Sequence, residues 1–227
     1  MRKFLLSTII GLFALAVAPA RADTLTFNFT SDHCTGGCSV GAANMGTITV
    51  TDVSAGVVSV HVALATGFGF VSTGAGAGAS FFFRLIGNPQ ITYSGITTGW
   101  TIPNVVPVNK QNAGTYAGDG LSGEYEYALA CDPPGPPTGC DNGGSAPKAS
   151  PLDFTVTATG LTAASFNDTG GASGSPFAAD VISSNGRTGL IDASLSTNPA
   201  VPEPTSIVLL GGVLVFTVRA IRRKRSV

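Results

Sequence analysis

The sequence predicts an all-β fold over residues 23–200, an antiparallel β-sandwich of the jelly-roll-like or Ig-like kind. Three observations predict it. Apolar and polar residues alternate in several short segments, and this period of two is typical of strands with one buried face. Turn-forming segments separate them, rich in the chain's 30 glycines and 14 prolines. No stretch of twelve or more residues between 23 and 200 has the periodicity of an amphipathic helix. A barrel is the alternative arrangement of such strands.

Five segments carry the alternation, and we expect each of them to form a strand. They are TLTFNF at 24–29, GTITVTD at 46–52, VVSVHVAL at 57–64, EYEYALA at 124–130 and PLDFTVTA at 151–158. In the fourth segment, Tyr125, Tyr127 and Leu129 are expected to share one face. In the third, His61 falls on the face opposite the valines.

Two further segments differ from this alternating pattern. SFFFRLI at 80–86 is apolar on both faces, which predicts a central strand that is buried on both sides. Asn185-Gly186 lies between FAADVI and TGLIDAS, and this dipeptide favours a tight hairpin turn.

Residues 1–22 have the pattern of a secretory signal peptide. A basic Arg-Lys start precedes an apolar run, and Ala20 and Ala22 place small residues where a signal peptidase reads them. We therefore expect signal peptidase to cleave before Asp23. The exported chain would then reach an oxidising compartment, in which cysteines can pair.

The charges are distributed unevenly along the chain. From Asp23 to Glu203 there are thirteen acidic residues against four basic ones, a net charge of −9. Nucleic-acid binding needs a basic surface, so we expect no nucleic-acid partner. The span of about 180 residues is enough for one domain with its own core.

The four cysteines allow three pairings, which the sequence by itself does not distinguish. Cys34 and Cys38 flank a short Thr-Gly-Gly turn, whereas Cys131 and Cys140 flank a proline-rich loop. We favour these two local disulfides. The alternative is a zinc site that includes His33, but the spacings match no common zinc motif.

We find no catalytic or cofactor-binding motif, so we predict a protein that is not an enzyme and that uses no cofactor or metal. One alternative is a hydrolase in which Glu124 and Glu126, two residues apart on a strand, act as acid and base.

A binding module for adhesion is the second alternative. Five aromatic residues could form a sugar-stacking platform: Tyr93, Trp100, Tyr116, Tyr125 and Tyr127. Glycine-rich segments with Asp and Asn, AGDGLSGE at 117–124 and CDNGG at 140–144, could bind calcium, although they lack EF-hand spacing.

The C-terminal segment, 201–227, begins with Val201, Pro202, Glu203 and Pro204 and continues with an uncharged, mostly apolar run at 207–218. The run and its flanks predict a transmembrane helix of about 16 residues, about 24 Å long. That is shorter than the hydrocarbon core of about 30 Å, which favours temporary retention over permanent anchoring. The two prolines stiffen the chain around Glu203, where a membrane enzyme could read it.

A basic tail follows the apolar run. It consists of Arg219, Arg222, Arg223, Lys224 and Arg225. Cations at this position are expected to stay on the cytoplasmic side and to stop translocation.

These three features, in this order and at this terminus, resemble the PEP-CTERM sorting signal of Gram-negative bacteria. The resemblance implies that the chain is a substrate of exosortase, a polytopic membrane cysteine transpeptidase. It also implies a cell-surface or matrix protein that associates with exopolysaccharide after a membrane-anchored stage in the inner membrane. The body, residues 23–200, resembles the β-rich bodies of such proteins, which implies a fold and an address but no activity. An ordinary single-pass anchor is the alternative.

Overall fold

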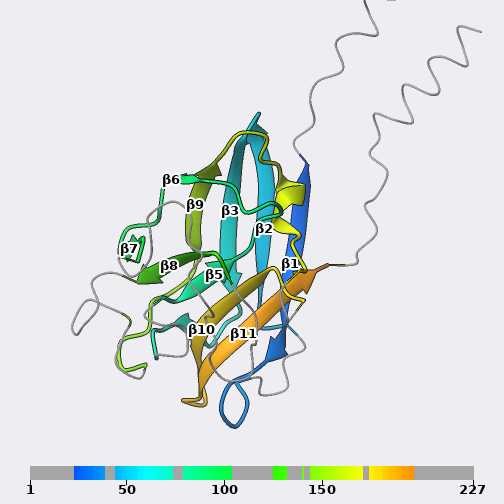
Figure 1. Ribbon diagram of the computed structural model, residues 1–227. Helices are drawn as coiled ribbons and strands as arrows, with labels where there is room; N and C mark the ends of the chain where they lie inside the picture. The colour runs from blue at the N-terminus through cyan, green and yellow to red at the C-terminus, as the bar shows by residue number, and fades with distance from the viewer. Residues whose placement is uncertain are drawn as a thin grey trace, which may run out of the picture. The chain divides into compact units, whose positions relative to one another are not determined.

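The computed structural model describes residues 23–38, 44–73, 79–103, 125–131, 140, 144–170 and 174–196. All of them belong to the first of the two units into which the chain divides, Met1–Ser196. They confirm the all-β class, because eleven strands form one curled antiparallel sheet in the order β6-β9-β3-β2-β1-β11-β10-β5-β8-β7, with β4 paired to β10 (Figure 1). The predicted arrangement as a sandwich of two sheets is not confirmed, since the strand order is continuous.

The strands divide into two halves of that sheet. The first half contains β1 (Thr24–Asp32), β2 (Gly46–Ser54), β3 (Val57–Leu64), β6 (Thr92–Ser94) and β9 (Leu152–Thr157). The second half contains β4 (Phe68–Phe70), β5 (Phe81–Phe83), β7 (Trp100–Thr101), β8 (Tyr127–Cys131), β10 (Phe177–Ser183) and β11 (Thr188–Leu195). A short 3-10 helix, η1 (Ala163–Phe166), lies between β9 and β10 in the chain.

The first half confirms the alternating pattern. In β2 and β3 every second side chain is buried in the main core, as Ile48, Val50 and Val60 illustrate. The residues between them are threonines, a serine, a histidine and an alanine, and they remain exposed or half-buried. The period of two therefore separates an apolar inner face from a polar outer face.

The second half is buried on both faces. All three phenylalanines of β5 are buried, which confirms the predicted central strand. One face joins the main core, and the other joins a small cluster with Ala79, Ala128, Ala178 and Leu190. Tyr125 belongs to that small cluster, whereas Tyr127 belongs to the main core, so the prediction that they share a face is wrong. The reason is that β8 begins at Tyr127, and the period of two does not extend back to Tyr125.

Aromatic side chains from the two halves meet across the main core. Phe27 of β1 packs edge-to-face on Phe177 of β10, with ring centroids 4.8 Å apart. Phe154 of β9 lies 5.9 Å from Phe81 and 5.7 Å from Phe83 of β5. The curled sheet thus folds over one core, which contains most of its buried aromatic surface.

The predicted hairpin at Asn185-Gly186 is confirmed. Strands β10 and β11 pair antiparallel from Phe177↔Ala193 to Ile182↔Thr188. Gly186 has φ +77°, the left-handed conformation that glycine adopts without strain. The Asn185 side chain accepts a hydrogen bond from the Arg187 backbone N–H at 3.0 Å, which closes the turn.

Candidate functional site

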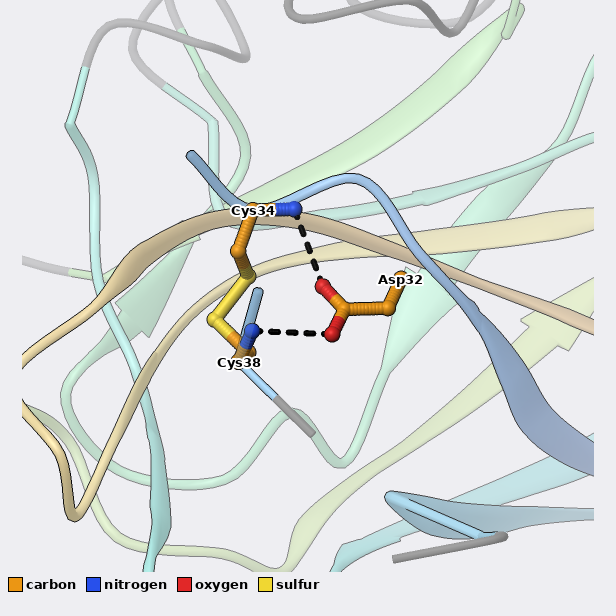
Figure 2. A group of neighbouring side chains, drawn as sticks. All are labelled: Asp32, Cys34 and Cys38. Atoms are coloured by element: carbon orange, nitrogen blue, oxygen red, sulfur yellow. Dashed lines mark hydrogen bonds between the residues drawn. A yellow bond between two sulfur atoms is a disulfide. The ribbon is translucent and has the colours of Figure 1, made fainter. Parts of the chain in front are cut away.

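A short turn closed by the Cys34–Cys38 disulfide lies where β1 ends (Figure 2). The carboxylate of Asp32 accepts two backbone hydrogen bonds, from the N–H of Cys34 at 3.0 Å and from the N–H of Cys38 at 2.8 Å. Gly37 N–H also donates to the Cys34 carbonyl at 2.9 Å. One carboxylate therefore holds both ends of the turn, and we call Asp32 and residues 34–38 the clamped turn.

The clamped turn brings together three groups of the kinds that bind metals, with ligand atoms within 4.8 Å of one another. Both sulfur atoms are bonded to each other, however, and a metal binds the thiolate form of cysteine. His33 does not point into the group, since its Nε2 lies 3.1 Å from a carboxylate oxygen of the buried Asp192. This arrangement is a structural clamp, and it differs from the zinc site that was the alternative.

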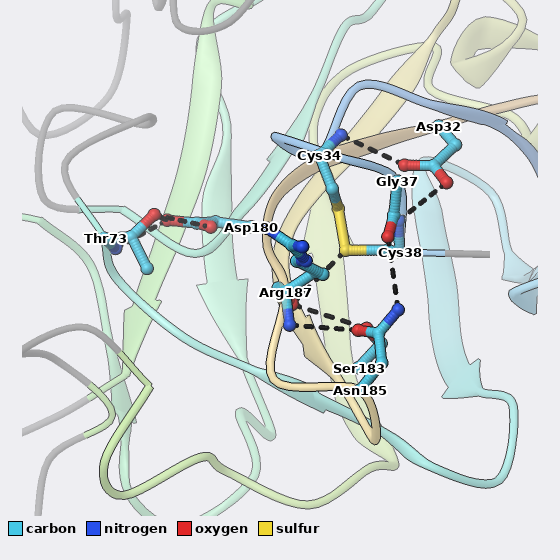
Figure 3. Close-up of a disulfide and its surroundings, with 9 residues drawn as sticks. All are labelled: Asp32, Cys34, Gly37, Cys38, Thr73, Asp180, Ser183, Asn185 and Arg187. Carbon is cyan, nitrogen blue, oxygen red and sulfur yellow. Dashed lines mark hydrogen bonds between the residues drawn. A yellow bond between two sulfur atoms is a disulfide. The ribbon is translucent and has the colours of Figure 1, made fainter. Parts of the chain in front are cut away.

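The β10–β11 turn docks on the clamped turn (Figure 3). The Asn185 amide donates to the Gly37 carbonyl at 3.2 Å, and the Cys38 sulfur lies 3.4 Å from the Arg187 carbonyl oxygen. The backbones approach closely at Gly189, where a Cβ would lie 2.6 Å from Cys34 Cα. The clamped turn thus ties β1 to the hairpin.

The second disulfide, Cys131–Cys140, confirms the other local pairing, and no cysteine of the chain is free. It packs on the buried Ser80, whose Oγ lies 3.1 Å from the Cys131 sulfur and 3.4 Å from the Cys140 sulfur. The Cys140 carbonyl accepts a hydrogen bond from the Ser72 N–H at 2.8 Å. The disulfide and this hydrogen bond therefore attach Cys140 to the second half of the sheet.

Two further carboxylates of the described chain, one buried and one half-buried, accept hydrogen bonds from backbone and side-chain donors. The fully buried Asp180 accepts hydrogen bonds from Thr73, from its N–H at 2.6 Å and from its hydroxyl at 2.9 and 3.0 Å. Asp52 accepts one at 2.6 Å from Ala163 N–H at the start of η1. These carboxylates satisfy the polar groups of strand and helix ends.

The glutamate pair of the hydrolase alternative is not assembled in the described residues. Glu126 forms an ion pair with the largely buried Arg84 at 3.2 Å, and Arg84 also lies 3.5 Å from Asp168. Glu124 lies outside the described residues. Glu126 is therefore engaged with Arg84, and the described residues do not bring a second glutamate beside it.

The aromatic residues proposed as a sugar-stacking platform are mostly core residues. Trp100 is 7% exposed, and Tyr125 and Tyr127 are each 1% exposed. Tyr93 is half-buried and packs on Phe154, while Tyr116 lies outside the described residues. A ring in the core has no free face for a sugar, so Trp100, Tyr125 and Tyr127 do not form this platform.

Sequence reasoning overlooked the regular hydroxyl array on the outside of the first half of the sheet. Thr24, Thr51, Ser59, Thr155 and Ser94 are consecutive cross-strand partners, so five hydroxyls form a row across five strands. A second row contains Thr26, Thr49, His61 and Asp153. We call these two rows the hydroxyl face. Neighbouring partners in a row are about 4.8 Å apart, because that is the spacing of strands in a sheet.

The only ionisable side chains in the two rows of the hydroxyl face, His61 and Asp153, pair with each other. His61 Nδ1 lies 2.6 Å from a carboxylate oxygen of Asp153, and both side chains are about half exposed, at 50% and 53%. This confirms the expected place of His61 on the more polar face. The surface therefore offers hydroxyl donors and acceptors without a lysine or an arginine.

The residues of the predicted signal cleavage site and of the predicted C-terminal sorting signal lie outside the described residues. These are Ala20 and Ala22 of the signal cleavage site, the motif Val201 to Pro204, and the five cations of the basic tail. Within the described part of the chain, no helix is long and apolar enough to cross a membrane.

Comparison with known proteins found no similarity: no protein-family model, curated protein or solved structure matches this chain.

Proposed function

We propose that this chain is an exported protein of the cell surface or extracellular matrix, without enzymatic activity. Its residues 201–227 serve as a sorting signal of the PEP-CTERM type, which an exosortase-like transpeptidase reads. One observation carries the proposal: the order of V-P-E-P, an apolar run and a basic tail in the last 27 residues. We further propose that the curled sheet is a sandwich of the jelly-roll-like or Ig-like kind, and the main core between its two halves supports this.

The two disulfides support export of the chain to an oxidising compartment. All four cysteines are paired within short loops, and such bonds persist in oxidising compartments outside the cytoplasm. Export through signal peptidase is consistent with this chemistry.

The C-terminal segment would act in two steps. Its apolar run enters the inner membrane, and the tail from Arg219 to Arg225 stays on the cytoplasmic side. Glu203, between two prolines, is then displayed just outside the bilayer for the transpeptidase. The body passes from this transient anchor to the surface or to exopolysaccharide.

Mass spectrometry of surface material from a host with exosortase tests the proposal. We expect no peptide from Ile207 onward in the wild-type protein. In a Glu203→Ala variant the tail should remain attached, whereas the neighbouring Ser206→Ala variant should be processed normally. Recovery of the intact tail from wild-type surface material would contradict the proposal.

A carbohydrate-binding adhesion module is the second candidate, and the hydroxyl face is the observation that favours it over calcium binding. The face is uncharged apart from the His61–Asp153 pair, which suits a neutral polysaccharide. A pull-down with a neutral polysaccharide should retain residues 23–196, and Thr49→Val with Thr51→Val should reduce the bound fraction. A Val53→Thr variant, altered at an exposed position off the two rows, is the control. Equal retention of all three proteins would contradict this candidate.

A further inference from the structure

A shallow groove lies beside the β10–β11 turn, where β4 pairs with β10. Its volume of about 410 Å³ falls within the range of about 300–1,000 Å³ for small-ligand pockets. Such pockets combine apolar walls with a few polar groups. The residues that line the groove and bear on its chemistry are Phe68, Pro147, Lys148, Ile182, Ser183 and Ser184.

Two glycines of the β4 segment preserve the shape of this groove. A Cβ on Gly67 would lie 3.3 Å from Ser184 Oγ, and a Cβ on Gly69 would lie 2.8 Å from Pro147 Cβ. A glycine in a strand often marks the close approach of another segment or of a ligand. A side chain at either position would therefore press against a wall of the groove.

Two cations adjoin the groove and the turn. Lys148 is half-buried, and its backbone exchanges two hydrogen bonds of 2.8 Å with Phe70 of β4. Arg187 is exposed, and its guanidinium lies against the clamped turn, since a Cβ on Gly36 would be 3.1 Å from Arg187 Cζ (Figure 3). In the described part of the chain neither cation forms an ion pair, whereas Arg84 is paired twice. Lys148 and Arg187 are thus available to a negatively charged ligand.

Lys148 and Arg187 flank the same pair of strands. The Arg187 carbonyl accepts a hydrogen bond from the Ser183 N–H at 2.9 Å, and Ser183 pairs with Phe68 of β4. The backbone of Lys148 pairs with the other edge of β4. Three strand spacings, about 14 Å, therefore separate the two segments. A chain molecule that crosses these strands would meet Lys148, then the groove, then Arg187.

We propose that the groove and its two flanking cations bind an acidic polysaccharide through the carboxylates of its sugar units. The proposal rests on the export of the body, which is part of the proposed function, but it does not need the sorting signal. Ammonium and guanidinium groups form charge-assisted hydrogen bonds with carboxylates, and arginine can do so in a bidentate manner. Phe68 and Pro147 add apolar contact for a sugar ring.

The two cations favour this ligand over a neutral polymer and over a lipid surface. A neutral polymer gains no charge-assisted bond from an unpaired cation. An anionic bilayer is usually recognised by clusters of about 4–8 lysine and arginine residues, which is more than the two found here. The acidic groups elsewhere on the body are screened beyond about 8 Å at physiological ionic strength, so they oppose an anionic polymer only weakly.

Calorimetric titration of the full-length chain in detergent micelles with polygalacturonate tests the proposal. Every protein in the comparison carries serine at positions 222–225, so that the basic tail does not bind the polymer. One variant removes both cations, Lys148→Gln with Arg187→Gln, and a second keeps both charges, Lys148→Arg with Arg187→Lys. Thr26→Glu with Thr157→Glu is the control, because it changes the net charge equally at exposed positions on the hydroxyl face. Urea midpoints verify that all four proteins are folded.

We expect the loss of both cations to weaken binding at least about 10-fold, and the charge-conserving variant and the control to weaken it less than about 3-fold. An unchanged affinity without the two cations, or an equal loss in the control, would overturn the proposal.

Three further ligands test the chemistry on the chain with native groove residues, so they need no substitution in the groove. Fully methyl-esterified polygalacturonate has the same sugars without the charge, and polyglutamate has carboxylates without sugar rings. We expect both to bind more weakly than polygalacturonate, and equal binding of either would overturn the proposal. It is also overturned if phosphatidylglycerol in the micelles displaces the polymer, because the cations would then serve a lipid surface. None of these results bears on the sorting signal, which the fate of residues 207–227 decides.

Discussion

At the residue scale, a few side chains and glycines determine how closely the backbone segments approach. Asp32 and Asn185 hold the clamped turn and the β10–β11 turn by bonds to backbone groups. Gly189 has φ +150°, and its Cα faces the backbone of Cys34. These contacts are polar or steric, so hydrophobic patterning does not reveal them.

Gly189→Ala should destabilise the fold by about 2–4 kcal/mol, because strain at positive φ is added to a clash with backbone that cannot move freely. Gly186→Ala is the matched control in the same hairpin. It also has positive φ, but its Cβ meets no atom within 4 Å, so we expect a loss of about 1 kcal/mol. Urea unfolding measures both, and equal losses would show that the contact with Cys34 is unimportant.

The buried hydroxyl of Tyr127 leads us to expect that the stability of the fold depends on pH in the alkaline range. Burial, and secondarily the charge of Glu126, raise the pKa of its hydroxyl well above the ordinary value of about 10. A group with a raised pKa stabilises the fold fully below its unfolded pKa and loses that contribution as the pH rises. Stability should therefore fall above pH about 10, by up to about 1.4 kcal/mol per pH unit.

The Tyr127→Phe variant separates this contribution from those of other groups. It loses the hydrogen bond to the Asn88 side chain at 2.9 Å, so at neutral pH it should be about 1 kcal/mol less stable. The difference in unfolding free energy between the variant and the wild type should become smaller above pH about 10, because only the wild type loses the contribution of the Tyr127 hydroxyl. Urea midpoints across this range provide the measurement, and a constant gap would refute the expected titration.

At the element scale, the disulfides and the carboxylates work together to attach loops to strands. The Cys131–Cys140 bond closes ten residues, worth about 2.7 kcal/mol in the chain-entropy model, whereas Cys34–Cys38 closes five, worth about 2 kcal/mol. The Cys34–Cys38 disulfide, which contributes less, is supplemented by the two backbone hydrogen bonds to the Asp32 carboxylate. The clamped turn can thus join β1 to the β10–β11 hairpin.

Asp32→Asn should destabilise the fold by about 1–3 kcal/mol, because the new amide group directs N–H donors at a backbone N–H. Asp153→Asn also replaces a carboxylate by an amide, but in an exposed pair with His61. We therefore expect it to lower the stability by less than about 1 kcal/mol. Thermal unfolding of the oxidised proteins compares them. A loss for Asp32→Asn as small as that of the control would mean that the carboxylate does not hold the turn.

At the scale of the whole molecule, charge is separated between an acidic body and a basic tail. A cation at the bilayer centre is unfavourable by about 2.5–3.5 kcal/mol on insertion scales, so several cations strongly oppose translocation. The described body lacks a helix long enough to anchor it. In our proposal, residues 207–225 hold the precursor in the membrane.

Replacing Arg222, Arg223, Lys224 and Arg225 with serine should release the unprocessed precursor into the periplasm, because only Arg219 would still resist translocation. A tail that merely binds anionic lipid would instead lose about 1 kcal/mol per cation and leave insertion intact. Cell fractionation followed by immunoblotting separates these results. Full membrane retention with normal processing would show that the cations do not stop transfer.

Much of the fold could be predicted from the sequence, because strand faces and tight turns depend on neighbouring residues. The alternation in β1, β2, β3 and β9, the Asn185-Gly186 hairpin and both local disulfides are of this kind. The sequence also supplies the terminal signals on which the proposed sorting depends.

Only the tertiary structure decided which distant segments meet. It placed Tyr125 and Tyr127 in different clusters, curled the strands into one continuous sheet, and turned Asp32 onto the disulfide turn. It also aligned the hydroxyl face and brought the start of β1 beside the end of β11. The physical reason is that pairing of remote strands follows from packing around a shared core, and no local period in the sequence encodes the partner.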